Sequence, residues 1–111
     1  MGGDLEPGKY LTVTVLDGDP TVVTLAGELD LASLPRLSAA LAPCSRDIEV
    51  HCAGLTFFGV VGVHALIAAH DACAERGSKL VVVNPSRPML RVLTLANVDT
   101  VLNIRQGGIP L

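Results

Sequence analysis

Apolar and polar residues alternate near the start of the chain. Leu11, Val13 and Val15 are separated by threonines, which is the period-two pattern of a half-buried strand. Residues 17–20 (DGDP) carry the residue types of a turn, and residues 21–28 form a second run rich in β-branched residues. These two runs predict a β-hairpin.

Three later segments have the apolar spacing of helices. The first begins after Ser33, which is a suitable N-cap residue, and has leucines at helical spacing up to residue 41. The second covers residues 60–76 and ends at a glycine, as many helices do. The third covers residues 88–96 and is followed by an asparagine that can adopt the left-handed conformation.

Short apolar runs between these segments predict the remaining strands, at residues 48–52, 80–83 and 101–104, with a loop at 54–59. The run at 80–83 (LVVV) lacks alternation, which is typical of a strand covered on both faces. The resulting order is strand, strand, helix, strand, helix, strand, helix, strand. Strands that alternate with helices predict an α/β domain with a mixed, mostly parallel sheet flanked by helices.

The chain length suits one domain, because single hydrophobic cores commonly hold about 100–150 residues. We expect residues 1–111 to form that domain, with tails at 1–9 and 105–111 that show no periodicity. The N-terminus has neither the basic nor the apolar segment of a signal peptide. No apolar run reaches the roughly 18 residues that span a bilayer, so we expect no membrane insertion.

Composition narrows the class of protein further. Half of the residues are hydrophobic and 17% are charged, which favours a folded chain. The net charge is −3 and aromatic residues make up 3%, so we expect no nucleic-acid partner. Three cysteines without a CxxC pair predict reduced thiols and a cytoplasmic location.

Two neighbouring pairs of histidine and cysteine raise the question of catalysis or metal binding. These are His51 with Cys52, and His70 with Cys73. No further ligand completes a metal site, and buried cysteines usually act as small apolar residues. We therefore expect no enzyme activity, no metal and no cofactor, with His70 as a hydrogen-bonded core histidine and His64 as a solvated helix residue.

Glycines surround the start of the second predicted helix. A helix N-terminus preceded by glycine can bind a phosphate, but neither of the common nucleotide-binding motifs is present. The favoured interpretation is that Gly59 and Gly62 allow a tight turn and a close approach of the helix to the sheet. A small anionic ligand or nucleotide at Gly59–Gly62 stays open as the alternative.

The ordered set of motifs resembles STAS domains, in particular the bacterial anti-sigma factor antagonists. The resemblance covers residues 11–104 and rests on the segments VTLAGELDLASLPRL (23–37), GLTF (54–57), AAHDACAERG (68–77), LVVVNPS (80–86) and LRVLTLANVD (90–99). It implies a STAS-like fold and a regulatory module that binds an anti-sigma factor, often a serine kinase with a GHKL-type ATP site. Binding frees a sigma factor in this family.

The sequence departs from the family at the phosphorylation motif. In the family, a kinase phosphorylates a serine in an Asp-Ser-Ser/Thr-Gly motif at the start of the second helix, and the added charge breaks the complex. Here Gly59 replaces the aspartate, Val60 the phosphorylated serine and Val61 the next hydroxyl, and only Gly62 is retained. Valine cannot be phosphorylated, and we expect the nearest hydroxyl, Thr56, to be buried against the sheet.

Three hypotheses follow from this difference. In the first, the protein is an antagonist that always stays competent to bind its anti-sigma factor. In the second, binding is controlled through the thiols, with Cys44, Cys52 and Cys73 as candidate redox residues. In the third, the protein is a regulatory subunit of a transporter or sensory complex. The resemblance places the partner-binding surface at Asp30, Ser33, Gly59, Val60, Val61, Gly62, Val63 and His64. Asp30 and Ser33 are also suited to capping.

Overall fold

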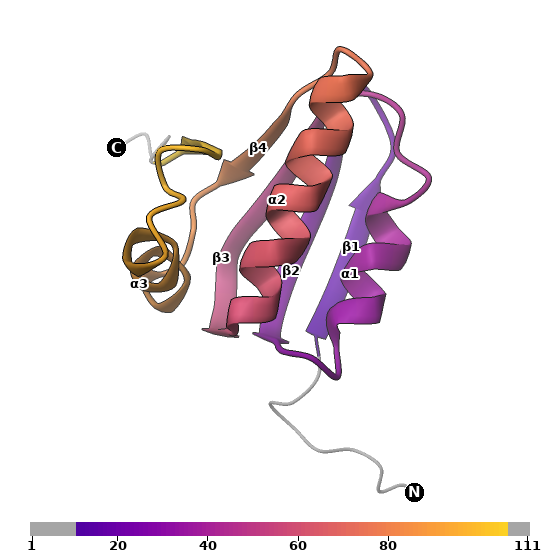
Figure 1. The fold of residues 1–111 in the computed structure, drawn as a ribbon. Coiled ribbons are helices and arrows are strands. Elements are labelled where there is room, and N and C mark those ends of the chain that lie inside the picture. The colour runs from indigo at the N-terminus through magenta and orange to yellow at the C-terminus, as the bar shows by residue number, and fades with distance from the viewer. Residues whose placement is uncertain (1–10, 107–111) are drawn as a thin grey trace, which may run out of the picture.

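The computed structural model describes residues 11–106, which form an α/β domain (Figure 1). The order of elements predicted from the sequence is confirmed. The described elements are β1 (Leu11–Leu16), β2 (Thr21–Leu29), α1 (Leu34–Leu41), β3 (Ile48–Phe58), α2 (Val60–Glu75), β4 (Leu80–Val83), α3 (Arg87–Leu95) and β5 (Asn103–Arg105). The predicted tail at residues 1–9 lies outside the described residues, as do residues 107–111.

The five described strands form one sheet in the order β1-β2-β3-β4-β5. β1 is antiparallel to β2, and the other neighbours are parallel. Helices α1 and α2 lie side by side on one face of the sheet (Figure 1). α3 packs against β3 beyond the end of the shorter β4. The parallel arrangement brings the carboxyl ends of β2 and β3 to the same edge, which is where α/β proteins commonly bind their ligands.

The hydrophobic core fills the space between the sheet and the helices. Alternate residues of the strands, such as Leu25 and Val50, are fully buried, and Leu66 of α2 meets them from the helix side. On the opposite face of the sheet the same alternation exposes Thr14 and Thr24, which pair across β1 and β2. The sheet therefore has one apolar face under helices and one face with polar side chains.

Strand β3 is longer than the sequence predicts, because residues 54–58 continue the strand instead of forming a loop. Two register irregularities relative to β2 accommodate this extension, one between Thr24 and Ala26 and one between Gly27 and Glu28. Gly54 lies at the first of them, where an added Cβ would come within 3.0 Å of the Ala26 side chain. The glycine that suggested a loop therefore marks a bulged strand.

Other boundaries shift by one or two residues. β5 begins at residue 103 and includes Arg105, which the sequence placed in the C-terminal tail. The prediction that residues 80–83 are covered on both faces is wrong for Val81, which is half-buried, whereas the other three residues of β4 are buried. Helices α2 and α3 end as the sequence predicts, because Gly77 (φ 77°) and Asn97 (φ 61°), which follow them, adopt the left-handed conformation.

Candidate functional site

Two strand-to-helix connections lie next to each other at the carboxyl edge of the sheet. One leads from β2 through Asp30–Ser33 into α1, and the other leads from β3 through Gly59 into α2. The Gly59 N–H donates to the Leu29 carbonyl at 2.8 Å, which ties the second connection to the first. An added Cβ on Gly59 would lie 3.8 Å from the Asp30 Cα and 3.4 Å from the Phe57 ring. The start of α2 and the turn after β2 therefore form one continuous surface.

The turn after β2 is held by hydrogen bonds between Asp30 and Ser33. The Ser33 N–H and hydroxyl each donate to Asp30 Oδ1 at 3.0 Å, and the Asp30 N–H donates to Ser33 Oγ at 3.0 Å. The Ser33 hydroxyl also lies 2.8 Å from the Glu28 carbonyl. The donation from the Ser33 N–H, supported by its hydroxyl, lowers the pKa of Asp30 below its usual value.

The connection into α2 uses glycine and apolar packing in place of such hydrogen bonds. Gly59 is the N-cap residue of α2 and has no side chain to cap the helix. At Gly62, an added Cβ would come within 2.6 Å of the Phe58 ring and 2.9 Å of Leu29 Cδ2. Both of these side chains are buried. The prediction that a glycine lets the helix approach the sheet is therefore confirmed at Gly62.

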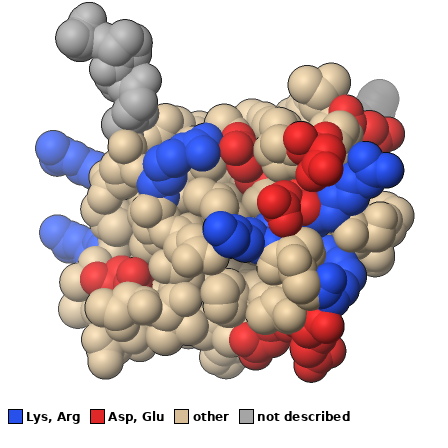
Figure 2. All heavy atoms as spheres, turned by 90° about the horizontal axis from the view of Figure 1, so that it is seen from above, with Lys and Arg blue, Asp and Glu red and all other residues tan. Residues whose placement is uncertain are grey.

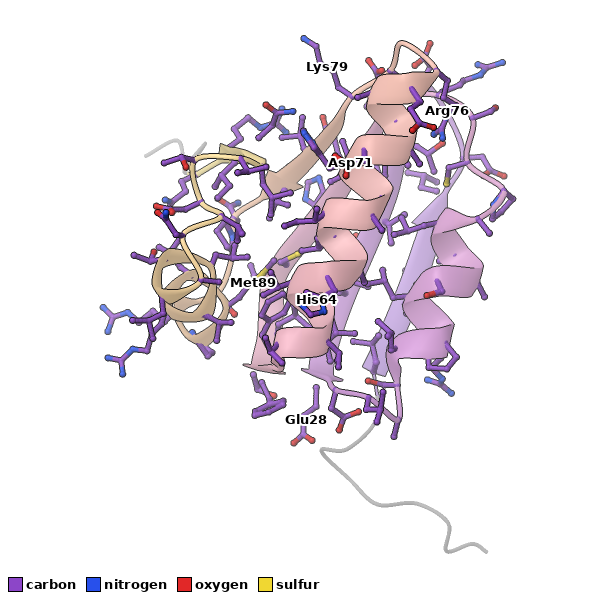
Figure 3. The ribbon with its side chains drawn as sticks, viewed as in Figure 1. Glu28, His64, Asp71, Arg76, Lys79 and Met89 are labelled. Carbon is purple, nitrogen blue, oxygen red and sulfur yellow. The ribbon has the colours of Figure 1, made fainter. Side chains whose placement is uncertain are left out.

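Three large apolar side chains are exposed in or next to these two connections. Leu31 is 72% exposed, Val60 60% and Phe57 49%. Phe57 pairs with Glu28 across β2 and β3, and the Glu28 side chain extends from this edge of the sheet (Figure 3). We call Leu31, Phe57 and Val60 the apolar rim. The adjacent carboxylates of Glu28 and Asp30 give this rim an acidic border.

The structure divides the residues that the resemblance assigns to the partner-binding surface. Val60 and His64 are exposed, and His64 lies one turn along α2 from the rim (Figure 3). Asp30, Gly59 and Val61 are half-buried. The buried members, whose side chains or Cα atoms pack inside the domain, are Ser33, Gly62 and Val63.

Sequence reasoning did not identify two members of the rim. Phe57 and Phe58 are consecutive residues of β3, and only Phe58 is buried. In a strand, neighbouring side chains point to opposite faces, so one phenylalanine of the pair had to face outward. The sequence predicts a loop at residues 54–59, where this alternation does not apply. Leu31 lies in a turn, where alternation gives no such signal.

The first four residues of α2, 60–63, carry no hydroxyl group. Val60 is the first residue of the helix and is exposed, and Val61 follows it. The expectation that Thr56 is buried is wrong. Thr56 lies in the extended part of β3, is exposed, and donates its hydroxyl hydrogen to the Gly27 carbonyl at 3.1 Å.

The three cysteines are free thiols. Cys52 is fully buried, and burial raises the pKa of its thiol to about 12. Cys73 is also buried, next to the Arg76 guanidinium at 3.4 Å. Cys44 is half-buried, and burial raises the pKa of its thiol. Reactive cysteines are usually accessible and have a lowered pKa, and neither Cys44 nor Cys52 matches that description.

The pair of His51 and Cys52 does not form a catalytic dyad. Their side chains point to opposite faces of β3, with Cys52 in the core and His51 half-buried on the open face. His51 Nε2 lies 2.9 Å from Glu49 Oε1, which Arg105 also contacts at 3.2 Å. The hydrogen bond to His51, together with Arg105, lowers the pKa of Glu49.

His70 differs from the prediction of a hydrogen-bonded core histidine. It is half-buried, and its Nδ1 is buried without a hydrogen-bond partner among the described residues. The same side of α2 presents Leu66 and Ile67 to the apolar core, which supplies few polar groups. Residues 11–106 also contain no cluster of three or more histidine, cysteine or acidic residues that could hold a metal ion.

Three cavities of the described structure lie away from the start of α2. One of about 270 Å³ lies between α1 and α2 and includes Cys73 and Arg76. Another of about 340 Å³ lies beside the β1–β2 turn and includes Cys44, and a third of about 330 Å³ lies on α3. None of these three is lined by residues 59–64.

Charges of both signs are interleaved on the face shown in Figure 2, which views the domain from the carboxyl end of α2, opposite the candidate site. This face therefore has no continuous basic surface of the kind that binds nucleic acids. Within residues 11–106, none of the helices combines the length and the apolar character needed to cross a membrane.

Comparison with known proteins identifies the class to which this fold belongs. The sequence model of the STAS_2 family, described as "Mlab, STAS domain", matches residues 13–105. The chain therefore belongs to the STAS domain family. No curated protein sequence matches it significantly.

Two solved structures share the fold. An anti-sigma factor antagonist from Mycobacterium paratuberculosis superposes with a TM-score of 0.78 at 23% identity, covering 90% of this chain and 88% of that one. The anti-sigma factor antagonist SpoIIAA in its unphosphorylated form gives a TM-score of 0.70 at 17% identity, covering 87% of each chain. At these identities the similarity establishes the fold that the sequence predicted.

Proposed function

We propose that this protein is a cytoplasmic, non-enzymatic anti-sigma factor antagonist whose complex is not released by phosphorylation at the start of α2. The observation that carries the proposal is Val60, an exposed apolar residue at the first position of α2. The sequence resemblance assigns this position to the serine that is phosphorylated in the family. A valine has no oxygen to accept a phosphoryl group, so the usual charge-based release is chemically unavailable there.

The apolar rim supports binding of a protein partner. Leu31, Phe57 and Val60 are large exposed side chains in or next to the two adjacent connections. Aromatic and aliphatic side chains at the centre of an interface usually contribute most of the binding energy. The carboxylates of Glu28 and Asp30 border the rim, so the complementary surface is apolar with basic residues around it. Both solved relatives described above are named as anti-sigma factor antagonists.

Control through the thiols has less physical support than constitutive binding. Cys52 and Cys73 are buried in the core, and burial raises the pKa of both Cys44 and Cys52. A raised pKa leaves less thiolate, which is the form that oxidants attack. A partner in a transporter or sensory complex is the remaining alternative, and the binding experiment below separates the two classes of partner.

The test measures the binding of purified anti-sigma factors from the source genome to the full chain by biolayer interferometry. We expect one of them to bind, and Val60→Asp to weaken binding at least about tenfold, because it places a charge in an apolar contact. Val101→Asp is the matched control, since Val101 is 48% exposed outside the rim. The proposal fails if no anti-sigma factor binds, or if the two substitutions have equal effects.

A further inference from the structure

Strand β1 lies at an edge of the sheet and is unusually open to pairing. It pairs with β2 along one side, and no described residue forms a backbone ladder with its other side (Figure 1). Its six residues, LTVTVL, include no charge and no proline, and its register with β2 is continuous. Natural edge strands are usually protected by charges, proline or bulges, because unprotected edges pair with other chains.

The direction of the backbone groups in β1 follows from two independent hydrogen bonds. The Thr21 N–H donates to the Asp47 backbone carbonyl at 2.8 Å, so the backbone N–H and C=O groups of Thr21 point toward β3. Because these groups alternate along a strand, Thr24 directs its groups toward β1, where it pairs with Thr14. Thr14 therefore bonds to β2, and its neighbours in β1 point away from the sheet.

The second hydrogen bond agrees with this assignment. The Arg36 guanidinium donates to the Leu11 carbonyl, which accordingly points outward from β1. The same alternation directs the N–H and C=O groups of Val13 and Val15 outward. No described residue bonds to these groups, so they are available for a further strand.

We propose that a second copy of this chain pairs with β1 in an antiparallel arrangement centred on Thr14. In this register the outward N–H and C=O groups of Val13 form hydrogen bonds with those of Val15 in the second copy. The two-fold axis generates the same pair of bonds between Val15 and Val13 of the second copy. Thr14 then lies opposite its own equivalent, as a closed two-fold interface requires. The two sheets join into one continuous sheet.

Several features of β1 favour a second copy as the partner. The strand has no charged residue, so two molecules of net charge −3 do not place like charges along the shared seam. A threonine opposite a threonine is a favourable cross-strand pair. Leu16 is 67% exposed and Val15 43% exposed at the end of the strand, and the second copy covers part of both.

Cysteine cross-linking tests the register directly in the full chain. Thr14→Cys, combined with Cys44→Ala to remove the half-buried native thiol, places two cysteines opposite each other at a non-hydrogen-bonded pair. Their Cα atoms are then about 4.5 Å apart, within the range that a disulfide accepts. Thr12→Cys in the same background is the matched control, because its two copies lie about 14 Å apart along the seam. Copper–phenanthroline with dioxygen is the oxidant.

We expect a covalent dimer from Thr14→Cys and not from Thr12→Cys, together with a concentration-dependent dimer of the unmodified chain in sedimentation velocity. Val13→Pro removes an outward N–H that β2 does not use, so it should leave the circular dichroism spectrum unchanged and weaken dimerisation about tenfold or more. The proposal is overturned if the unmodified chain is monomeric at every concentration, or if the two cysteine variants cross-link equally.

Discussion

Where β2 leads into α1, side-chain hydrogen bonds hold the turn, whereas the turn from β3 into α2 depends on glycine and close apolar packing. The first has the bonded pair Asp30 and Ser33, with Ser33 buried. The second has Gly59 without a side-chain cap and Gly62 against the Phe58 ring. Two adjacent connections of the same type are therefore built by different interactions, and only the first has a hydroxyl group at its helix start, the buried one of Ser33.

The largest expected effect concerns the packing of α2. Gly62→Val should reduce the free energy of unfolding by about 3 kcal/mol, because the new side chain overlaps the buried Phe58 and Leu29. The free energy of unfolding of Gly62→Ala should lie between those of Gly62→Val and the unmodified protein. Gly59→Ala is the control, with a loss below about 0.5 kcal/mol, since its added Cβ meets only ordinary contacts. Urea denaturation measures all three, and equal losses at positions 59 and 62 would contradict the packing argument.

The next effect concerns the hydrogen-bonded turn. Ser33→Ala should cost about 2 kcal/mol of unfolding free energy, because it removes a buried hydroxyl and leaves the Glu28 carbonyl and Asp30 with fewer partners. Ser38→Ala, on the exposed side of α1, should change stability by less than about 0.5 kcal/mol. Thermal unfolding compares the two variants. If Ser33→Ala is as stable as the unmodified protein, the turn does not need these hydrogen bonds.

Acid should affect the first connection through Asp30. Its pKa in the folded state is lowered, so ionised Asp30 stabilises the fold above its ordinary value of 3.8. This contribution is lost as the pH falls through the lower folded pKa. As the pH falls through this range, the free energy of unfolding of the Asp30→Asn variant should therefore decrease less than that of the unmodified chain. Urea denaturation at a series of pH values checks this, and parallel curves for the two proteins would contradict it.

The smallest effect on stability is expected at the apolar rim. Val60→Ala and Leu31→Ala should each change the unfolding free energy by less than about 0.5 kcal/mol, because both side chains are mostly exposed. The same substitutions should weaken partner binding, since the rim forms the proposed contact. Denaturation and interferometry on the same samples distinguish the two roles. A large loss of stability would mean that these residues maintain the fold.

The sequence was sufficient for the order of elements but insufficient for the surface. Helix α2 is found at residues 60–75, one residue shorter than its apolar spacing predicts, because that spacing reflects burial against the sheet. The extension of β3 was missed because Gly54 has the same appearance in a loop and in a bulge. The bulge depends on contact with Ala26, which is distant in sequence.

The candidate site shows the same limit. The resemblance to the family implies that Val60 replaces a serine, but whether a residue near Val60 faces the solvent depends on tertiary packing. Ser33 and Val63 fit the family's contact region by position, yet both are buried. Leu31 and Phe57 complete the surface only because the two connections lie next to each other.

The most direct test of the central claim is intact-mass analysis of the complex with an anti-sigma factor that has kinase activity, before and after addition of ATP and Mg²⁺. We expect that the unmodified chain gains no phosphate and stays bound. Gly59→Asp combined with Val60→Ser restores the hydroxyl and should be phosphorylated and released. Phosphate on the unmodified chain, for example at the exposed hydroxyl of Thr56, accompanied by release of the partner, would contradict it.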